Sequence, residues 1–121
     1  MNLPSESLLL RIFIGESDRH RGHPRYEAIV LKARETGLAG ATVLRSAMGF
    51  GANSRLHTAK NLRLYDDLPL IVEIVDEETK INAFMTLLDG MMGGGLVTLE
   101  KVRVIHYRHE SGAHQKETAP P

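Results

Sequence analysis

The sequence predicts an α+β domain with the ferredoxin-like order βαββαβ, in which two helices lie on one face of a four-stranded antiparallel sheet. Amphipathic segments with helical spacing separate the first predicted strand from the second and the third from the fourth. A length of 121 residues leaves room for one hydrophobic core. We therefore expect one folded domain over residues 1–108 and a flexible tail over 109–121. The strand patterns occur at residues 7–14, 41–50, 70–75 and 96–107.

The first predicted strand alternates in polarity and carries large aliphatic residues on one face: Leu8, Leu10, Ile12 and Ile14. Residues 15–23 are polar and are expected to form a loop. Pro24 suits the start of a helix, because its missing N–H would have no helical partner there. Gly37 or Gly40 is expected to end this helix. Its apolar residues follow at helical spacing: Tyr26, Ile29, Val30 and Ala33.

The second half of the chain is expected to repeat this pattern after a long loop. The second strand ends at the glycine pair Gly49 and Gly51, and residues 52–67 form the loop. A loop of this length in a small domain is usually functional or flexible. Asp76 is expected to be the N-cap of a helix over residues 77–89. The apolar stripe of that helix consists of Ile81, Phe84, Met85 and Leu88.

The composition excludes several classes of function. Basic and acidic residues balance at 15 each, so the chain lacks the positive charge expected of a general nucleic-acid-binding protein. The sequence contains no cysteine, which excludes disulfides, thiol catalysis and thiolate metal sites. No apolar run is long enough to span a bilayer. We therefore expect a cytoplasmic protein with no nucleic-acid partner and no membrane insertion.

The sheet face that no helix covers is expected to be partly apolar. Burying six large apolar residues contributes on the order of several kcal/mol at roughly 25 cal/mol per Å², and exposed apolar patches mark association surfaces. We therefore expect oligomerisation through the sheet, with a monomer of mixed surface as the alternative. Depending on the register, the face carries Leu9, Phe13, Ile71, Val75, Leu99 and Ile105 among the charged residues Arg11, Glu73, Lys101 and Arg103.

Two segments resemble a known family. Gly-Ala-Thr-Val at 40–43 precedes Gly-Phe-Gly at 49–51, and Gly-Met-Met-Gly-Gly-Gly-Leu-Val-Thr occupies 90–98. Together they resemble the PII signalling proteins, and most of all an uncharacterised, PII-like family of domain-of-unknown-function proteins. The similarity covers nearly the whole domain, residues 8–108. Two further stretches are typical of that family: Arg-Leu-His-Thr-Ala-Lys at 55–60 and Gly-Gly-Gly-Leu-Val-Thr-Leu-Glu-Lys-Val at 93–102.

The resemblance implies a regulatory homotrimer whose sheets pack around a central axis. Clefts between subunits would hold a small anionic effector such as an adenine nucleotide, and loop 52–67 would report the ligand to a protein partner. We expect no enzymatic activity, no catalytic residue, no metal ligand and no cofactor beyond that effector. The ligand-binding residues that this comparison indicates are Gly49, Gly51, Arg55, His57, Lys60, Gly93, Gly94, Gly95, Leu96, His106 and Arg108.

The residues support this interpretation in part. Clustered glycines let backbone N–H groups converge on an anion, and Arg108 offers a planar, bidentate partner for phosphate. The chain departs from the family at Leu96, where PII proteins carry a lysine, and at His106, where they carry an arginine. A mono- or diphosphate, a cyclic nucleotide or a non-nucleotide ligand therefore suits the chain at least as well as a triphosphate. Residues 52–64 contain no tyrosine, so control by uridylylation is not expected.

Two alternatives stay open. Histidines spaced by three residues could share a metal in a CutA-like trimeric metal-binding or structural protein. Arg19 or Arg21 could serve a small acyl-phosphate hydrolase, although their loop lacks the glycine-and-valine cradle expected of an acylphosphatase. Exposed histidines and solvated arginines are the simpler interpretation of both patterns. The histidine pairs are His20 with His23 and His106 with His109.

Overall fold

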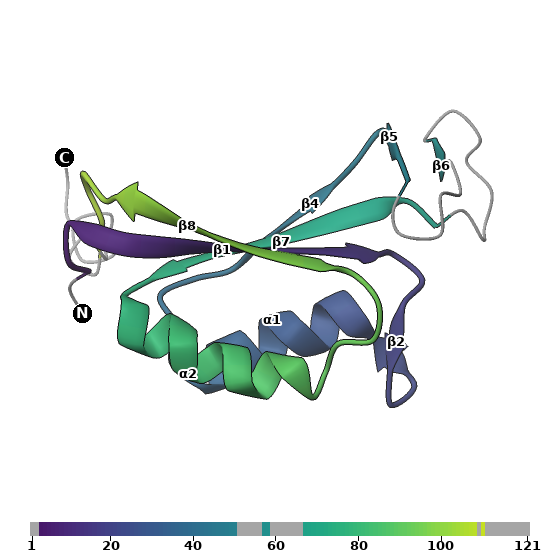
Figure 1. Ribbon diagram of the computed structural model, residues 1–121, viewed down its shortest axis with the longest axis horizontal. Coiled ribbons are helices and arrows are strands. Elements are labelled where there is room, and N and C mark those ends of the chain that lie inside the picture. The colour runs from purple at the N-terminus through teal and green to yellow at the C-terminus, as the bar shows by residue number, and fades with distance from the viewer. Residues whose placement is uncertain (1–2, 51–56, 59–66, 109, 111–121) are drawn as a thin grey trace, which may run out of the picture.

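Two long central strands organise the sheet in the computed structural model, which describes residues 3–50, 57–58, 67–108 and 110. Strand β1 (Glu6–Gly15) and strand β7 (Pro69–Asp76) pair in antiparallel register, with β4 (Thr42–Arg45) and β8 (Leu96–Arg103) at the edges in the order β4-β7-β1-β8. Helices α1 (Arg25–Glu35) and α2 (Glu78–Asp89) lie on the same face of this sheet (Figure 1). The predicted α+β ferredoxin-like fold is confirmed.

The hydrophobic core fills the space between the sheet and the two helices. Directly opposite residues of β1 and β7, such as Ile12 and Val72, point to the same face of the sheet and are fully buried. Helix α2 buries Ile81, Phe84 and Leu88, as predicted, and Met85 packs against the core from a partly buried position. The other buried apolar residues of the cluster are Leu10, Ile14, Ile29, Ala33, Leu70, Ile74 and Met91.

Helix α1 begins and ends where its sequence predicts. It starts at Arg25, directly after Pro24, and its C-cap is Thr36. Gly37 follows with a φ of +82° and donates its N–H to the Arg34 carbonyl, while the Leu38 N–H bonds the Ala33 carbonyl. These two bonds form a Schellman motif, in which glycine accepts the left-handed backbone without a Cβ penalty.

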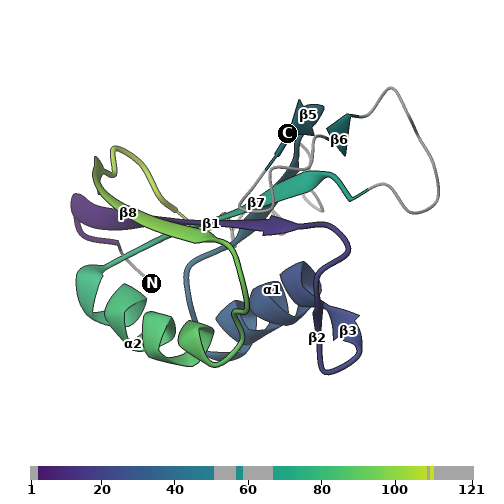
Figure 2. The same cartoon turned by 45° about the vertical axis from the view of Figure 1, so that its right-hand side comes forward.

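The second predicted strand is shorter than expected. Strand β4 stops at Arg45, which pairs with Leu70, and the chain then leaves the sheet to form β5 (Met48–Gly49), which pairs with β6 (His57–Thr58). The neighbouring β7 starts at Pro69, and proline has no N–H with which to extend the ladder. The β5–β6 pair therefore extends beyond the sheet, as Figure 2 shows.

The last predicted strand is also too long. Strand β8 ends at Arg103, and the final backbone bond of this edge runs from the Val104 N–H to the Ser5 carbonyl at 2.7 Å. The partner strand β1 has no residue before Glu6, and Pro4 cannot donate a further bond. Residues 104–107 therefore leave the sheet edge instead of extending it.

The prediction of Asp76 as an N-cap is wrong. Asp76 is the last residue of β7 and is fully buried, and the N-cap of α2 is Glu77. The Asp76 carboxylate accepts hydrogen bonds from the N–H groups of Glu77 at 2.7 Å and Ala39 at 2.8 Å. The side chain thus joins the end of β7 to the segment that enters β4.

Residues 15–23 contain more structure than the predicted loop. Strand β2 (Arg19–His20) pairs with β3 (His23–Pro24) in a short hairpin that precedes α1 (Figure 2). No helix in the described part of the chain is long and apolar enough to cross a membrane. Most of loop 52–67 and of tail 109–121 lies outside the described residues.

Removing the largest core side chain should test the packing of α2 on the sheet. Phe84→Ala should lower the free energy of unfolding by about 3–5 kcal/mol, because Phe84 is 1% exposed and its loss leaves a cavity. Leu87→Ala on the same helix is the matched control, since Leu87 is 44% exposed, and should cost less than about 1 kcal/mol. Urea denaturation measures both, and equal losses would contradict this packing.

Candidate functional site

The uncovered face of the sheet, here the open face, combines apolar and charged side chains. The strand register places Leu9, Arg11 and Phe13 of β1 beside Val75, Glu73 and Ile71 of β7, respectively. The prediction for the last strand is wrong by one residue, because Leu99 pairs with Leu10 and Lys101 with Leu8, so both belong to the helix side with Arg103. A one-residue shift exchanges the two faces of a strand. The residues of β8 on the open face are Leu96, Thr98, Glu100 and Val102.

Arg11 joins three strands at the centre of the open face. Its Nε donates to Glu73 at 2.9 Å, and its Nη1 donates to Glu100 at 2.8 Å. The hydrogen bond to Glu73 is the main reason that the pKa of Arg11 is raised above its ordinary value. One guanidinium thus meets two carboxylates, and the polar centre of the face is largely paired within the chain.

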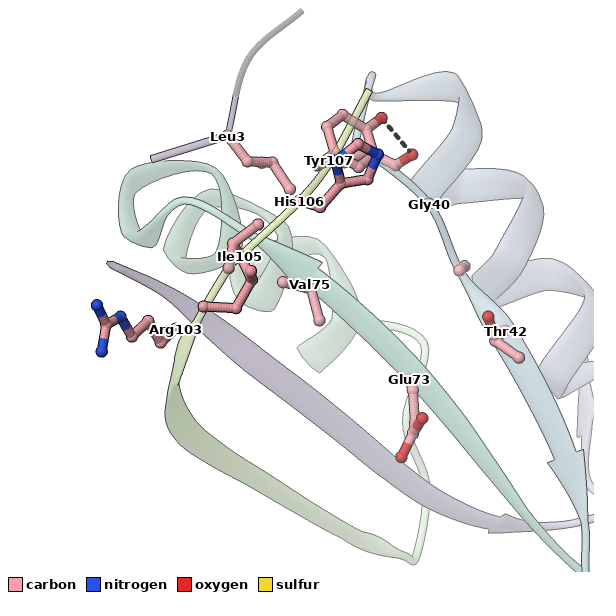
Figure 3. A pocket seen from close by; sticks show the side chains of 12 residues that line it. Leu3, Gly40, Thr42, Glu73, Val75, Arg103, Ile105, His106 and Tyr107 are labelled. Carbon is pink, nitrogen blue, oxygen red and sulfur yellow. Dashed lines mark hydrogen bonds between the residues drawn. The ribbon is translucent and has the colours of Figure 1, made fainter. Parts of the chain in front are cut away.

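The segment after β8 encloses a pocket at one end of the open face. Its volume is about 560 Å³, within the range of about 300–1,000 Å³ typical of small-molecule sites. The Tyr107 hydroxyl donates to the Ala39 carbonyl at 3.1 Å and holds the segment against the chain that enters β4 (Figure 3). The pocket is lined by Leu3, Ala39, Gly40, Ala41, Thr42, Glu73, Val75, Arg103, Val104, Ile105, His106 and Tyr107.

The lining of this pocket is mostly apolar and includes a few polar groups. Leu3, Val75 and Ile105 supply apolar surface, whereas Thr42 and Glu73 supply a hydroxyl and a carboxylate. The side chain of Arg103 points outward from the pocket (Figure 3). His106 belongs to the lining, and Arg108 lies next to it, with Nη2 3.2 Å from His106 Nδ1. A cationic side chain therefore borders one end of the pocket.

The glycine-rich turn (residues 93–95) connects α2 to β8. Gly95 has a φ of +135°, and a Cβ there would lie 2.8 Å from the Phe13 carbonyl oxygen, so this position requires glycine. Gly94 has open space around its Cα, whereas a Cβ on Gly93 would lie 3.1 Å from Nη2 of Arg25. The turn therefore presents backbone to solvent on one side and packs on Arg25 on the other.

A single chain does not bring the predicted ligand-binding residues together. The glycine-rich turn and Leu96 lie at the start of β8, whereas His106 and Arg108 lie beyond its end. The eight residues of β8 separate these groups by roughly 25 Å, at about 3.3 Å per strand residue. Gly49 lies in β5 opposite His57, with its Cα against Pro69. The predicted residues Gly51, Arg55 and Lys60 lie outside the described part of the chain.

The alternative sites are only partly assembled. His20 and His23 lie directly opposite each other in the β2–β3 hairpin, but no group of three or more histidine, aspartate or glutamate side chains in the described ranges has the geometry of a metal site. Arg19 and Arg21 belong to the same hairpin. His109 lies outside the described residues, so the pair that it makes with His106 stays a prediction.

Sequence reasoning missed most of the pocket. Thr42, Glu73 and Val75 were expected only as strand residues, and Tyr107 as the end of a strand. The segment at 40–43 carried a usable signal, because it is one of the two segments that carry the family resemblance and its residues Gly40, Ala41 and Thr42 line the pocket. The role of Tyr107 had no such signal, since it depends on where β8 ends.

Comparison with known proteins gives a family match over most of the chain. The model of the DUF190 family, described as "Uncharacterized ACR, COG1993", matches residues 7–104. A UPF0166 protein of Aquifex aeolicus is 43% identical over 98 residues, covering 81% of this chain and 92% of that protein. A UPF0166 protein of Methanocaldococcus jannaschii is 30% identical over 97 residues, covering 79% and 89%.

Solved structures with a similar fold share little sequence with this chain. CPII of Thiomonas intermedia K12, a nitrogen regulatory PII-like protein bound to ADP, AMP and bicarbonate, has a TM-score of 0.64 at 14% identity, covering 82% of this chain and 88% of CPII. The GlnK–ATP complex of B. subtilis has a TM-score of 0.53 at 9% identity, covering 84% and 85%. CutA1 of Shewanella sp. SIB1 has a TM-score of 0.52 at 13% identity, covering 99% and 100%. These similarities establish the fold.

Two substitutions should show that the glycine-rich turn requires glycine at position 95 and tolerates a Cβ at position 94. Gly95→Ala should lower the free energy of unfolding by about 1–3 kcal/mol, because a Cβ there meets the Phe13 carbonyl oxygen at 2.8 Å and φ is positive. Gly94→Ala is the control, because no atom lies within 4 Å of the added Cβ. Thermal or urea unfolding compares the two, and equal stabilities would contradict the turn geometry.

Proposed function

The chain belongs to the DUF190 family, and from this premise we propose that it is a PII-like regulatory protein without enzymatic activity. In this proposal it forms a homotrimer through the open face and binds a small anionic effector, such as an adenine nucleotide, in clefts between subunits. Loop 52–67 then relays the bound state to a protein partner. The fold similarity to nucleotide-bound CPII and GlnK supports the proposal.

The observation that carries the proposal is the distance between the two halves of the site. The pocket, His106 and Arg108 lie at one end of β8, and the glycine-rich turn lies at the other. Neither half alone provides a complete site for a nucleotide. The pocket offers an apolar surface for a ring but lies far from the glycine-rich turn, and the turn offers backbone N–H groups without a pocket. Packing around a three-fold axis can bring the turn of one chain to the pocket of its neighbour.

The open face gives such packing its driving force. Phe13 and Ile71 lie side by side on it, as do Leu9 and Val75, and all four are only partly buried in the isolated chain. Each large aliphatic or aromatic side chain that becomes fully buried contributes about 1.5–3 kcal/mol. Arg11 is already paired with Glu73 and Glu100. Burying this cluster in an interface therefore does not leave the Arg11 charge without a partner.

The chemistry of the two halves matches the two parts of a nucleotide. The carboxylate of Glu73 and the hydroxyl of Thr42 can accept hydrogen bonds from an exocyclic amino group or a ring N–H. The N–H groups of the glycine-rich turn and the guanidinium of Arg108 are donors for phosphate oxygens. The ligand therefore combines a flat heterocycle with an anionic group.

The proposed partner surface begins at the base of loop 52–67. Met48 of β5 is 59% exposed, and Phe50 next to it is 65% exposed. Large exposed apolar side chains on an arm that extends beyond the sheet are typical of protein contact sites. A change in the order of this arm on ligand binding would change the affinity for the partner.

Mixing two defective variants tests whether the site is shared between chains. Thr42→Trp should block the pocket, and Gly94→Glu should place a negative charge in the turn without a steric clash. Neither variant alone should bind ADP in isothermal titration calorimetry. Co-refolded in equal amounts, they should recover about a quarter of the wild-type binding stoichiometry, because every mixed trimer has one intact cleft.

Native mass spectrometry of the same mixture, with the two variants distinguished by mass, checks that mixed trimers form. If mixed trimers form and the two defective variants still bind ADP no better together than apart, the shared-cleft proposal is wrong. If wild-type protein binds no adenine nucleotide at millimolar concentration, the nucleotide part of the proposal is wrong.

A further inference from the structure

The β2–β3 hairpin, here the basic hairpin (residues 19–24), has an unusual turn. Its two turn residues, Arg21 and Gly22, both have positive φ, at 51° and 84°. Two-residue hairpin turns of this class favour asparagine, aspartate or glycine, because other L side chains disfavour positive φ. In the described part of the chain, Arg21 is the sole non-glycine residue with this backbone conformation. Backbone strain of this kind clusters at functional sites, where the surrounding structure holds it.

The charges of the basic hairpin are largely uncompensated. Residues 19–25 contain Arg19, His20, Arg21, His23 and Arg25 and no carboxylate. The nearest acid before the hairpin, Asp18, already accepts from the Gly15 N–H at 2.9 Å and pairs with Arg25 at 3.4 Å. Within the described ranges, no ion pair involves Arg19 or Arg21, and both residues are exposed. The two guanidinium groups are therefore available to an anion.

Arg25 connects the basic hairpin to the glycine-rich turn. Its Nη2 donates to the Arg19 carbonyl at 2.9 Å, and the same guanidinium lies directly against the Cα of Gly93. Its Nε is buried and has no hydrogen-bond partner in the part of the chain that the structure describes. The hairpin and the turn, which are far apart in the sequence, thus lie on either side of one cationic side chain.

We infer that the basic hairpin and the glycine-rich turn form one surface for the phosphate groups of the effector, in which Arg19 and Arg21 bind the terminal phosphate. Arg25 is a positioning residue that holds the turn beside the hairpin. The inference rests on the proposed function and adds two guanidinium groups to the one that Arg108 supplies, on the side of the turn where Leu96 offers no charge. Guanidinium groups bind phosphate through paired, charge-assisted hydrogen bonds.

The competing interpretation is a hairpin whose arginines are only solvated. If the arginines are only solvated, removing their charges leaves the affinity for anions unchanged. If they bind phosphate, removing their charges lowers the affinity most for the ligands whose phosphate groups they contact. Screening by salt should weaken the binding further, because Arg19 and Arg21 are exposed. Affinities for ligands with different numbers of phosphates therefore distinguish the two interpretations.

The test is calorimetry of the full-length protein with AMP, ADP and inorganic pyrophosphate. The charge-removing variant is Arg19→Gln with Arg21→Gln, and a second variant combines Arg19→Gln with Arg21→Gly, which relieves the positive φ. The control removes the same charge from the outer helices, through Arg34→Gln with Lys80→Gln. Both hairpin variants should bind ADP and pyrophosphate about tenfold or more weakly, as expected for lost hydrogen bonds to a charged group, and AMP less than about threefold more weakly.

The outcomes separate the inference from the proposed function. Unchanged affinity of both hairpin variants for ADP and pyrophosphate overturns the inference and leaves the proposed function standing. Pyrophosphate binding that depends on the hairpin, without any binding of AMP or ADP, supports the phosphate surface and refutes the adenine nucleotide. A wild-type protein that binds none of the three probes overturns both. An equal loss in the Arg34 and Lys80 control shows that net charge, and not the hairpin, governs binding, and also overturns the inference.

Discussion

The structure depends on a sheet that is covered by helices on one face only. Core packing buries the helix side of β1 and β7, whereas the open face keeps Leu9, Phe13, Ile71 and Val75 partly exposed around the ion pairs of Arg11. Apolar side chains on both faces of a sheet favour a second covering layer, and paired charges at the centre lower the cost of adding one. The proposed trimer, the shared clefts and the relay through the β5–β6 arm all follow from how this face is covered.

The two ends of β8 carry the two halves of the proposed binding site. One end carries the pocket, beside which Tyr107 bonds the Ala39 carbonyl, and the other carries the glycine-rich turn that packs on Arg25. Because the eight residues of β8 separate its two ends, a ligand that contacts both groups lies between chains in the proposed trimer. The proposal therefore couples oligomerisation to ligand binding, since a ligand that binds only the assembled form stabilises it.

The sequence predicts the architecture well and the site less completely. Alternating residues such as Leu10 and Ile12, and the helical stripe of Ile81, Phe84 and Leu88, determine the faces of the central strands and of α2. The register of the edge strand β8 is not predictable from periodicity, because its apolar residues fall on both faces, with Val97 and Leu99 on the helix side and Val102 on the open face. The pocket and the basic hairpin were missed because both depend on where the chain leaves a strand, which Pro4, Pro69 and the turn at Arg21 decide.

Sedimentation velocity of the full-length protein at micromolar concentration tests most directly whether the open face is buried between copies. The account predicts one species with the mass of three chains, and a substitution that places a charge on the open face, Phe13→Asp, should dissociate it while α-helical circular dichroism persists. A wild-type protein that sediments as a stable, folded single chain over this concentration range would contradict the account.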